Sequence, residues 1–326
     1  MALKFRTEVA VNPVGCKVSH GSHVVTVGSC FSDEIGLRLQ RDLFDVAVNP
    51  VGTLYNPMSI ASSLDAIMSG RVYTEADLVC RDGIWHSFDH HSRFSSAGME
   101  QCLCRINSAM DAAREALRVC THLFVTFGTA FVYTRDGRVV ANCHKFPAAQ
   151  FERRRVTVDE IVGLWRPLME RLRAFAPGIN IVFTVSPIRH LSDGAHGNQL
   201  SKATLQLAVD TLIAGTDGYA GYFPAYELVL DDLRDYRFYA SDLTHPSDMA
   251  VDYIYGKFAD MYFTPETMRL ATEAGRLTRF AQHRQLTDDP IAAEAHALAL
   301  HSKIESLLNA CPDMAQAVNR YIHSLS

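Results

Sequence analysis

Cys30 is the residue of this sequence whose position most favours nucleophilic chemistry. The β-branched run His23–Val27 predicts a buried strand that ends at Gly28. From Phe31 to Phe44, apolar residues at four-residue spacing predict a helix. Cys30 would then stand in a strand-to-helix turn at the helix N-terminus, where unpaired N–H groups and the helix dipole favour a thiolate. The same N–H groups can stabilise an oxyanion that forms beside the attacking sulfur, so this turn suits acyl transfer.

A candidate base lies far along the chain, in the segment Asp242-Leu243-Thr244-His245-Pro246. An aspartate three residues before a histidine can reach the Nδ1 atom of the imidazole and leave Nε2 free to accept a proton. We therefore predict Cys30 as nucleophile, His245 as base and Asp242 as the residue that orients His245. Ser29 is an alternative nucleophile, and neighbouring side chains at a helix start point apart, so only one of the two should face His245.

Strands and helices alternate through the first 262 residues. Further strands are predicted over 45–48, 122–127 and 179–185, with a short one within 220–226 and helices between them. This alternation predicts a three-layer α/β/α fold around a mostly parallel central sheet. The turns at Gly28, Gly52, Gly128 and Ser186 would meet at the carboxyl edge of the sheet, where such folds bind ligands.

The texture changes after Phe263. Helix starts are expected at Thr264 and Thr287, and no strand pattern follows. We predict a catalytic domain over 1–262 and a helical extension over 263–326, which packs on the core or serves as a lid or dimer arm.

The order of these features, with a nucleophile on the first strand-to-helix turn and a DxxH motif near the domain end, resembles the SGNH/GDSL hydrolases. One branch is particularly similar, the GSCFA family, because the chain reads GSCFS at Gly28–Ser32. Further blocks that resemble this family are NPVGTLYNP (49–57), GTAFVY (128–133), NCHKFP (142–147), TVSPIRH (184–190), NQLSKATL (198–205) and YELVLDDLRDYRFYASDLTHP (226–246). The resemblance implies an SGNH-like fold and an esterase- or lipase-like activity, with Cys30 where the wider family has serine.

The wider family takes its oxyanion donors from the nucleophile's own N–H, a glycine after the second strand and an asparagine after the third. Gly52 matches the glycine. Gly128-Thr129-Ala130 matches the segment after the third strand, but Ala130 stands where the asparagine would be. Asn142, Asn49 or Asn56 would have to supply the missing amide, with Asn142 the first choice.

Other polar residues have weaker assignments. His144 lies in a family-like block and is a candidate contact for a carbonyl or an anion, and Arg189 follows the fourth strand at the expected site. His86, His90 and His91 are close in sequence, but no fourth ligand is evident, so no metal site and no cofactor are predicted.

Composition limits the partners and the compartment. The net charge is −5 and no long basic run occurs, so a nucleic-acid partner is not expected. No run of about 18 apolar residues and no leader-like N-terminus is seen, which predicts no membrane span and a cytoplasmic location. The eight scattered cysteines are expected to be mostly free thiols. The oligomeric state is left open.

Three functions fit these residues. The first is a hydrolase for acyl esters of small molecules, carbohydrates or lipids, in which Cys30 is the nucleophile. The second is an acyltransferase that works through a Cys30 thioester. The third is a non-catalytic carbohydrate- or acyl-binding protein, which the missing asparagine would explain. Redox sensing by Cys30 would need a resolving thiol such as Cys143 within disulfide reach.

Overall fold

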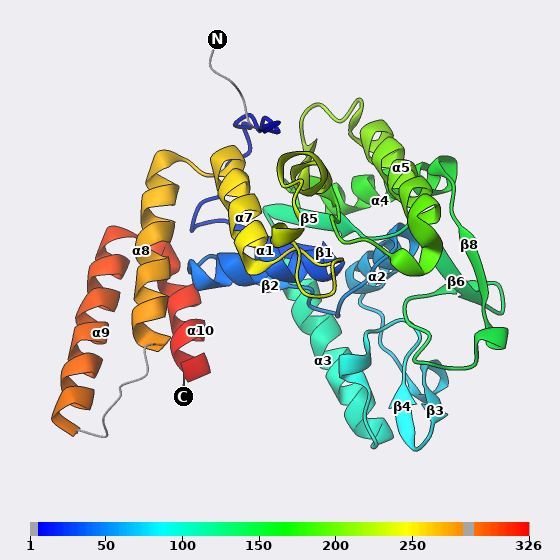
Figure 1. The fold of residues 1–326 in the computed structure, drawn as a ribbon. Coiled ribbons are helices and arrows are strands. Elements are labelled where there is room, and N and C mark those ends of the chain that lie inside the picture. The colour runs from blue at the N-terminus through cyan, green and yellow to red at the C-terminus, as the bar shows by residue number, and fades with distance from the viewer. Residues whose placement is uncertain (1–5, 283–289, 326) are drawn as a thin grey trace, which may run out of the picture.

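A five-stranded parallel sheet forms the centre of the molecule (Figure 1) in the computed structural model, which describes residues 6–282 and 290–325. The strand order is β10-β9-β5-β1-β2, and every pair is parallel. The strands are β1 (His23–Gly28), β2 (Asp45–Val48), β5 (His122–Phe127), β9 (Asn180–Val185) and β10 (Ala220–Tyr222). The strands predicted from the hydrophobic runs are therefore confirmed.

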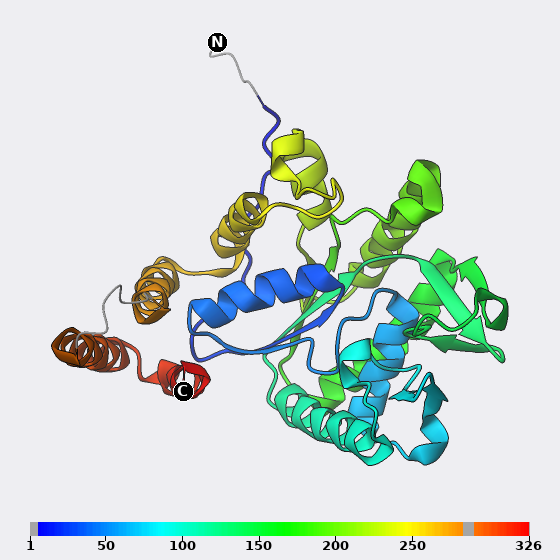
Figure 2. The same cartoon turned by 60° about the horizontal axis from the view of Figure 1, so that its bottom comes forward.

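Helices bury both faces of this sheet (Figure 2). Val24, Phe124 and Val182 point to one face, where they pack with α1 (Cys30–Arg41) and α7 (Asp248–Tyr262). The neighbouring residues Val25 and Leu123 point to the other, because side chains alternate along a strand. That face is covered by α2 (Pro57–Ser69), α3 (Met99–Arg118), α4 (Val158–Phe175) and α5 (Gly194–Ile213). The predicted three-layer α/β/α fold is confirmed.

Two small antiparallel sheets are inserted into this frame. One is the hairpin of β3 (Val79–Arg81) and β4 (Ile84–His86), within the segment 71–98. The other has the order β7-β6-β8 and consists of β6 (Phe131–Arg135), β7 (Arg138–Val140) and β8 (Glu152–Arg155). The chain enters β6 shortly after the carboxyl end of β5, which places this second sheet beside the functional edge of the central sheet (Figure 1).

Past α7 the chain is helical, as predicted, with α8 (Pro265–Gln282), α9 (Pro290–Ala310) and α10 (Ala315–Leu325). The helix start expected at Thr287 lies outside the described residues. These helices form an apolar cluster around Leu43, and Thr278 Oγ1 donates a hydrogen bond to the Arg41 carbonyl at 3.0 Å. They therefore pack at the C-terminal end of α1, about 18 Å along that helix from Cys30. The division into units at residue 262 stays a prediction. None of the described helices combines the length and the apolar character that crossing a bilayer requires.

Candidate active site

The turn that carries Cys30 is fixed by close backbone packing. Gly28 ends β1 with a φ of +135°, and a Cβ atom there would lie 2.2 Å from the Thr126 carbonyl oxygen of β5. Only glycine fits both this conformation and this contact. Ser29 is the N-cap residue of α1, which begins at Cys30. The thiol thus lies at the start of a helix and at the carboxyl edge of the central sheet.

The structure brings Cys30, His245 and Asp242 into one line of contacts. Cys30 Sγ lies 3.9 Å from His245 Nε2, within reach of a hydrogen bond to sulfur. On the other side of the ring, His245 Nδ1 lies 2.5 Å from Asp242 Oδ2. The second carboxylate oxygen of Asp242 accepts the backbone N–H groups of Thr244 at 2.9 Å and of His245 at 3.0 Å. These contacts fix the ring orientation and hold the pKa of Asp242 well below its usual range.

The Cys30 thiol is protonated at neutral pH, contrary to the thiolate expected from its helix position. Burial and then the negative charge of Asp33 raise the pKa of Cys30 to about 11. The backbone N–H groups of Cys30 and Phe31 act in the opposite direction, but they are outweighed. A reaction at this sulfur therefore requires a base that removes the proton, and His245 is the base in contact.

Ser29 does not share this environment. Its side chain is buried, and Oγ is enclosed without a hydrogen-bond partner among the residues that the structure describes. The Ser29 Cβ packs where a side chain on Gly128 would begin, 3.2 Å from the ideal Cβ position of that glycine. Of the two neighbouring residues, Cys30 is the one that faces His245 and the cavity.

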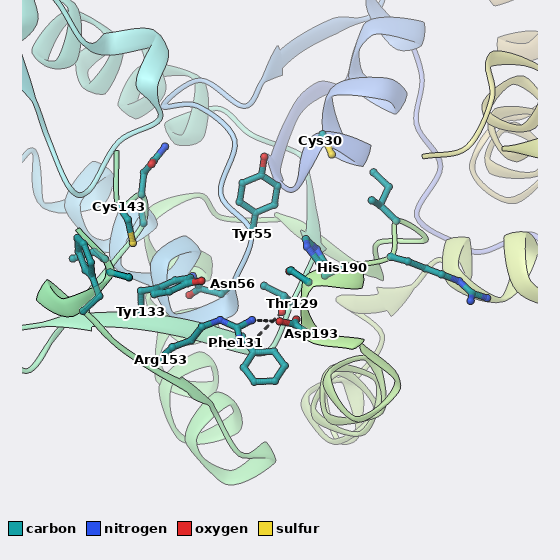
Figure 3. Close-up of a pocket in the computed structure, with 18 of the residues that line it drawn as sticks. Cys30, Tyr55, Asn56, Thr129, Phe131, Tyr133, Cys143, Arg153, His190 and Asp193 are labelled. Carbon is teal, nitrogen blue, oxygen red and sulfur yellow. Dashed lines mark hydrogen bonds and ion pairs between the residues drawn. The ribbon is translucent and has the colours of Figure 1, made fainter. Parts of the chain in front are cut away.

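A cavity of about 620 Å³ leads away from Cys30 and His245 along the small sheet of β6 and β8 (Figure 3). Figure 3 shows Cys30, Tyr55 and His190 at one end and Cys143 at the other. Besides Tyr55, four aromatic side chains line the cavity, namely Phe131, Tyr133, Phe146 and Phe151. Arg153 of β8 lies over the Phe131 ring at 4.1 Å and forms an ion pair with Asp193. The cavity is thus mainly apolar with one charged pair in its wall.

Two predicted oxyanion donors are already engaged, which corrects the sequence-based assignment. The Gly52 N–H donates to the Asn49 carbonyl at 2.8 Å, and the Gly128 N–H donates to the Tyr55 carbonyl at 2.8 Å. Gly52 instead has a packing role, since its φ is +94° and a Cβ would lie 2.4 Å from the Cβ of His91. Asn49 is buried as well, and its side chain accepts the Gly28 N–H.

Asn142 and Asn56 line the cavity, but their carbonyl oxygens are committed elsewhere. The Asn142 Oδ1 accepts the His144 N–H at 2.9 Å, and the Asn56 Oδ1 caps α2 through the Ser59 N–H at 2.8 Å. Neither amide NH₂ group has a hydrogen-bond partner among the described residues, so each is available to a ligand.

His144 and Arg189 differ in their relation to the cavity. Arg189 lines it, and its Nε is buried without a partner among residues 6–282 and 290–325. His144 lies behind the wall, where its Nε2 contacts the Ser87 carbonyl at 2.7 Å and its ring packs on His86 at 4.6 Å. His144 is therefore not among the residues that line this cavity, and its contact with substrate stays a prediction.

A buried lysine on α5 also lies near the site, although its place was not predicted from the sequence. Lys202 is 1% exposed, and its Nζ donates to the carbonyls of Gly128 and Ser186, each at 2.7 Å. This lysine joins the carboxyl ends of β5 and β9 beneath the cavity. One turn before it, Asn198 Oδ1 accepts the His190 N–H at 3.0 Å, and the adjacent Ser201 Oγ accepts the Ala130 N–H at 2.8 Å. A lysine at helical spacing before the apolar residues Leu205, Val209 and Leu212 was the available signal.

No metal site is formed by the histidines of the segment 71–98. Within the described part of the chain, no three His, Cys, Asp or Glu side chains are grouped so that they could hold a metal ion. His90 contacts Ser87 Oγ at 2.9 Å, and His86 contacts Ser95 Oγ at 2.7 Å, so both have local hydrogen-bond partners.

The sequence model of the GSCFA family matches residues 23–258, which include Cys30, Asp242 and His245. The chain belongs to the GSCFA family. No curated protein sequence matches it. Among solved structures, it is similar to an acetyl xylan esterase, Est2A, from the rumen bacterium Butyrivibrio proteoclasticus, at 12% identity and a TM-score of 0.38. That similarity covers 77% of this GSCFA chain and 64% of the esterase chain.

Proposed function

We propose that this GSCFA protein hydrolyses acyl esters through a thioester on Cys30. The observation that carries the proposal is the line of contacts from Cys30 Sγ through His245 to the carboxylate of Asp242. A nucleophile, a base and a group that orients the base are the minimum set for covalent acyl transfer. These residues lie at a cavity of about 620 Å³, which is large enough for a small-molecule substrate.

In the first half-reaction, Cys30 Sγ attacks the acyl carbon while His245 Nε2 takes the thiol proton. The raised pKa of Cys30 makes this proton transfer necessary, because little thiolate exists at neutral pH. The C–O bond of the tetrahedral intermediate then breaks, and the alcohol leaves with the proton from His245. In the second half-reaction, His245 removes a proton from water, whose oxygen attacks the thioester. The carboxylic acid departs, and the proton returns to the sulfur.

The exposure of the base favours hydrolysis over transfer to another acceptor. The side chains of His245 and Asp242 are each 49% exposed. Bulk water therefore has access to His245, the base that would activate a water molecule for attack. An acyltransferase protects its thioester from water until the acceptor binds. Acyl transfer stays the second candidate, and the apolar cavity beside Cys30 supplies room for an acceptor.

The side chains that line the cavity favour a class of substrate. Aromatic walls pack against an acyl chain or a sugar ring, and the Arg153–Asp193 pair offers polar contacts for hydroxyl groups. We therefore propose esters of small alcohols or carbohydrates as substrates.

The test is hydrolysis of p-nitrophenyl acetate and of acetylated sugars by wild type and by Cys30→Ala. We expect Cys30→Ala to lower kcat by about 10³-fold or more, since the covalent route is lost. Cys104→Ala is the matched control, because this exposed thiol lies on α3 and does not line the cavity. Its kcat should stay within about twofold of wild type.

Turnover that survives in Cys30→Ala would overturn the proposal. Binding of acylated sugars without turnover by wild type would favour the non-catalytic function. A burst of alcohol followed by release only when an acceptor is added would favour the acyltransferase.

A further inference from the structure

The proposed hydrolysis needs donors for the acyl oxygen, and the structure leaves one side of that oxygen without its expected partner. Backbone N–H groups are available at Cys30 and Phe31, which both lie at the start of α1. Ala130 is fully buried, and its own N–H is bound by Ser201 Oγ, so nothing at position 130 reaches a substrate. The N–H groups of Gly52 and Gly128 are engaged with backbone carbonyls.

His190 is a candidate for this donor, because it lines the same cavity as the proposed nucleophile. It follows the carboxyl end of β9 and lines the cavity together with Cys30 and His245. Figure 3 shows His190 on the same side of the cavity as Cys30 and Tyr55, and the Tyr55 ring meets the His190 ring edge-on with 6.1 Å between the centroids. Neither nitrogen of the His190 ring has a hydrogen-bond partner within the described residues, while its backbone N–H is held by Asn198. The residue is thus fixed at its backbone and free at its ring.

The environment of His190 makes it a donor rather than a base. Burial and the nearby positive charge of Lys202 lower the pKa of His190 to about 4, so the ring is neutral at neutral pH. Lys202 is held beneath the site by two carbonyls and cannot leave. A neutral imidazole carries one N–H group, which can donate to a developing oxyanion without giving up its proton.

We propose that His190 is a second catalytic histidine, which donates a hydrogen bond to the acyl oxygen of the tetrahedral intermediate on Cys30. This assignment rests on the proposed function. The two histidines then divide the work. His245 moves the proton between sulfur, alcohol and water, and His190 stabilises the negative charge on the oxygen while its own proton stays in place. The backbone N–H groups at Cys30 and Phe31 donate to the same oxygen from the helix side.

Two reactions of Cys30 separate these roles. Ester hydrolysis passes through an oxyanion, whereas alkylation by iodoacetamide is a direct displacement that forms none. We would measure both in wild type, His190→Ala, His190→Gln and His245→Ala, with His196→Ala as the control because His196 is an exposed residue at the start of α5. His190→Gln restores an amide donor and also serves if His190→Ala folds poorly.

We expect His190→Ala to lower kcat for p-nitrophenyl acetate by about 10²- to 10³-fold, with KM little changed. Its alkylation rate should stay within about twofold of wild type, while His245→Ala lowers both rates. His190→Gln should recover part of the lost kcat.

Cys30-dependent turnover that is insensitive to His190→Ala would overturn this inference and leave the proposed function standing. Equal losses of turnover and alkylation in His190→Ala would also overturn it, because His190 would then act by positioning the thiol. Turnover that does not depend on Cys30 would overturn both proposals.

Discussion

The two halves of the candidate site are built in opposite ways. The Cys30 half is anchored in the core, where the Asn49 side chain accepts the Gly28 N–H and donates to Asp33 Oδ1, both at 2.8 Å. The His245 half lies on a half-exposed loop, where the Asp242 carboxylate accepts local N–H groups within three residues. The first half depends on contacts distant in sequence, and the second on contacts within one turn.

Because of this difference, substitutions in the Cys30 half should lower the stability of the fold, whereas substitutions in the His245 half should lower activity alone. Buried hydrogen bonds at Asn49 contribute to folding and to the position of the sulfur, because a lost partner leaves an enclosed polar group unsatisfied. Contacts in the exposed loop contribute little to folding, since water replaces them. Substitutions in the two halves should therefore have distinct signatures.

The largest effect is expected for Asp242→Asn. The asparagine amide no longer favours the His245 tautomer that has its proton on Nδ1 and leaves Nε2 free toward Cys30. We therefore expect kcat to fall by about 10²- to 10⁴-fold. The thermal unfolding midpoint should change by less than about 2 °C, because both side chains are half exposed. Steady-state kinetics and calorimetry on the same samples check both values. A large fall in the unfolding midpoint would contradict the distinction between the halves.

An intermediate effect, on stability, is expected for Asn49→Ala. The change leaves the Gly28 N–H and the Asp33 carboxylate without their partner and places alanine at a φ of +38°. We expect the free energy of unfolding to fall by about 2–4 kcal/mol.

Asp136→Ala is the matched control for the backbone strain in Asn49→Ala. Asp136 has a φ of +52° in the exposed β6–β7 turn, so alanine there should cost about 1 kcal/mol or less. Urea unfolding measures both variants. Equal losses would show that the destabilisation of Asn49→Ala comes from backbone strain and not from the lost buried hydrogen bonds.

The smallest effect is expected for Asp33→Asn, on the protonation of Cys30. The negative charge of Asp33 helps to raise the pKa of the thiol to about 11, so its removal should lower that pKa. More thiolate is then present at any pH below the midpoint, and alkylation at pH 9 should accelerate by about two- to tenfold. Asp65→Asn, an exposed substitution on α2, is the control. A slower reaction would contradict the proposed sign.

The local half of the site and the fold were predictable from the sequence, because both arise from short patterns. Alternating strands and helices defined the layers, and the spacing of Asp242 and His245 placed two groups that meet within a single turn. The buried half was harder to predict, because the pKa of Cys30 depends chiefly on burial, and Lys202 reaches the Gly128 and Ser186 carbonyls from a helix distant in sequence. The helix position alone suggested a thiolate, but burial reversed the shift.

The glycines illustrate the same limit. Gly52 and Gly128 were expected at the site from their places after strands, but neither is among the residues that line the cavity. Their N–H groups are occupied by the carbonyls of Asn49 and Tyr55, which only the three-dimensional structure identifies. Likewise, His190 follows a predicted strand, but the sequence could not show that its ring has no hydrogen-bond partner among the described residues.

The central claim is that Cys30 carries the acyl group, and trapping of the intermediate tests it most directly. Wild-type protein would be mixed with p-nitrophenyl acetate, quenched in acid within milliseconds, and its peptides analysed by mass spectrometry. We predict an acetyl group on Cys30 that neutral hydroxylamine removes, as expected for a thioester, and none in Cys30→Ala. An acetyl group on Ser29, or steady turnover with no acyl-enzyme at any time, would contradict the account.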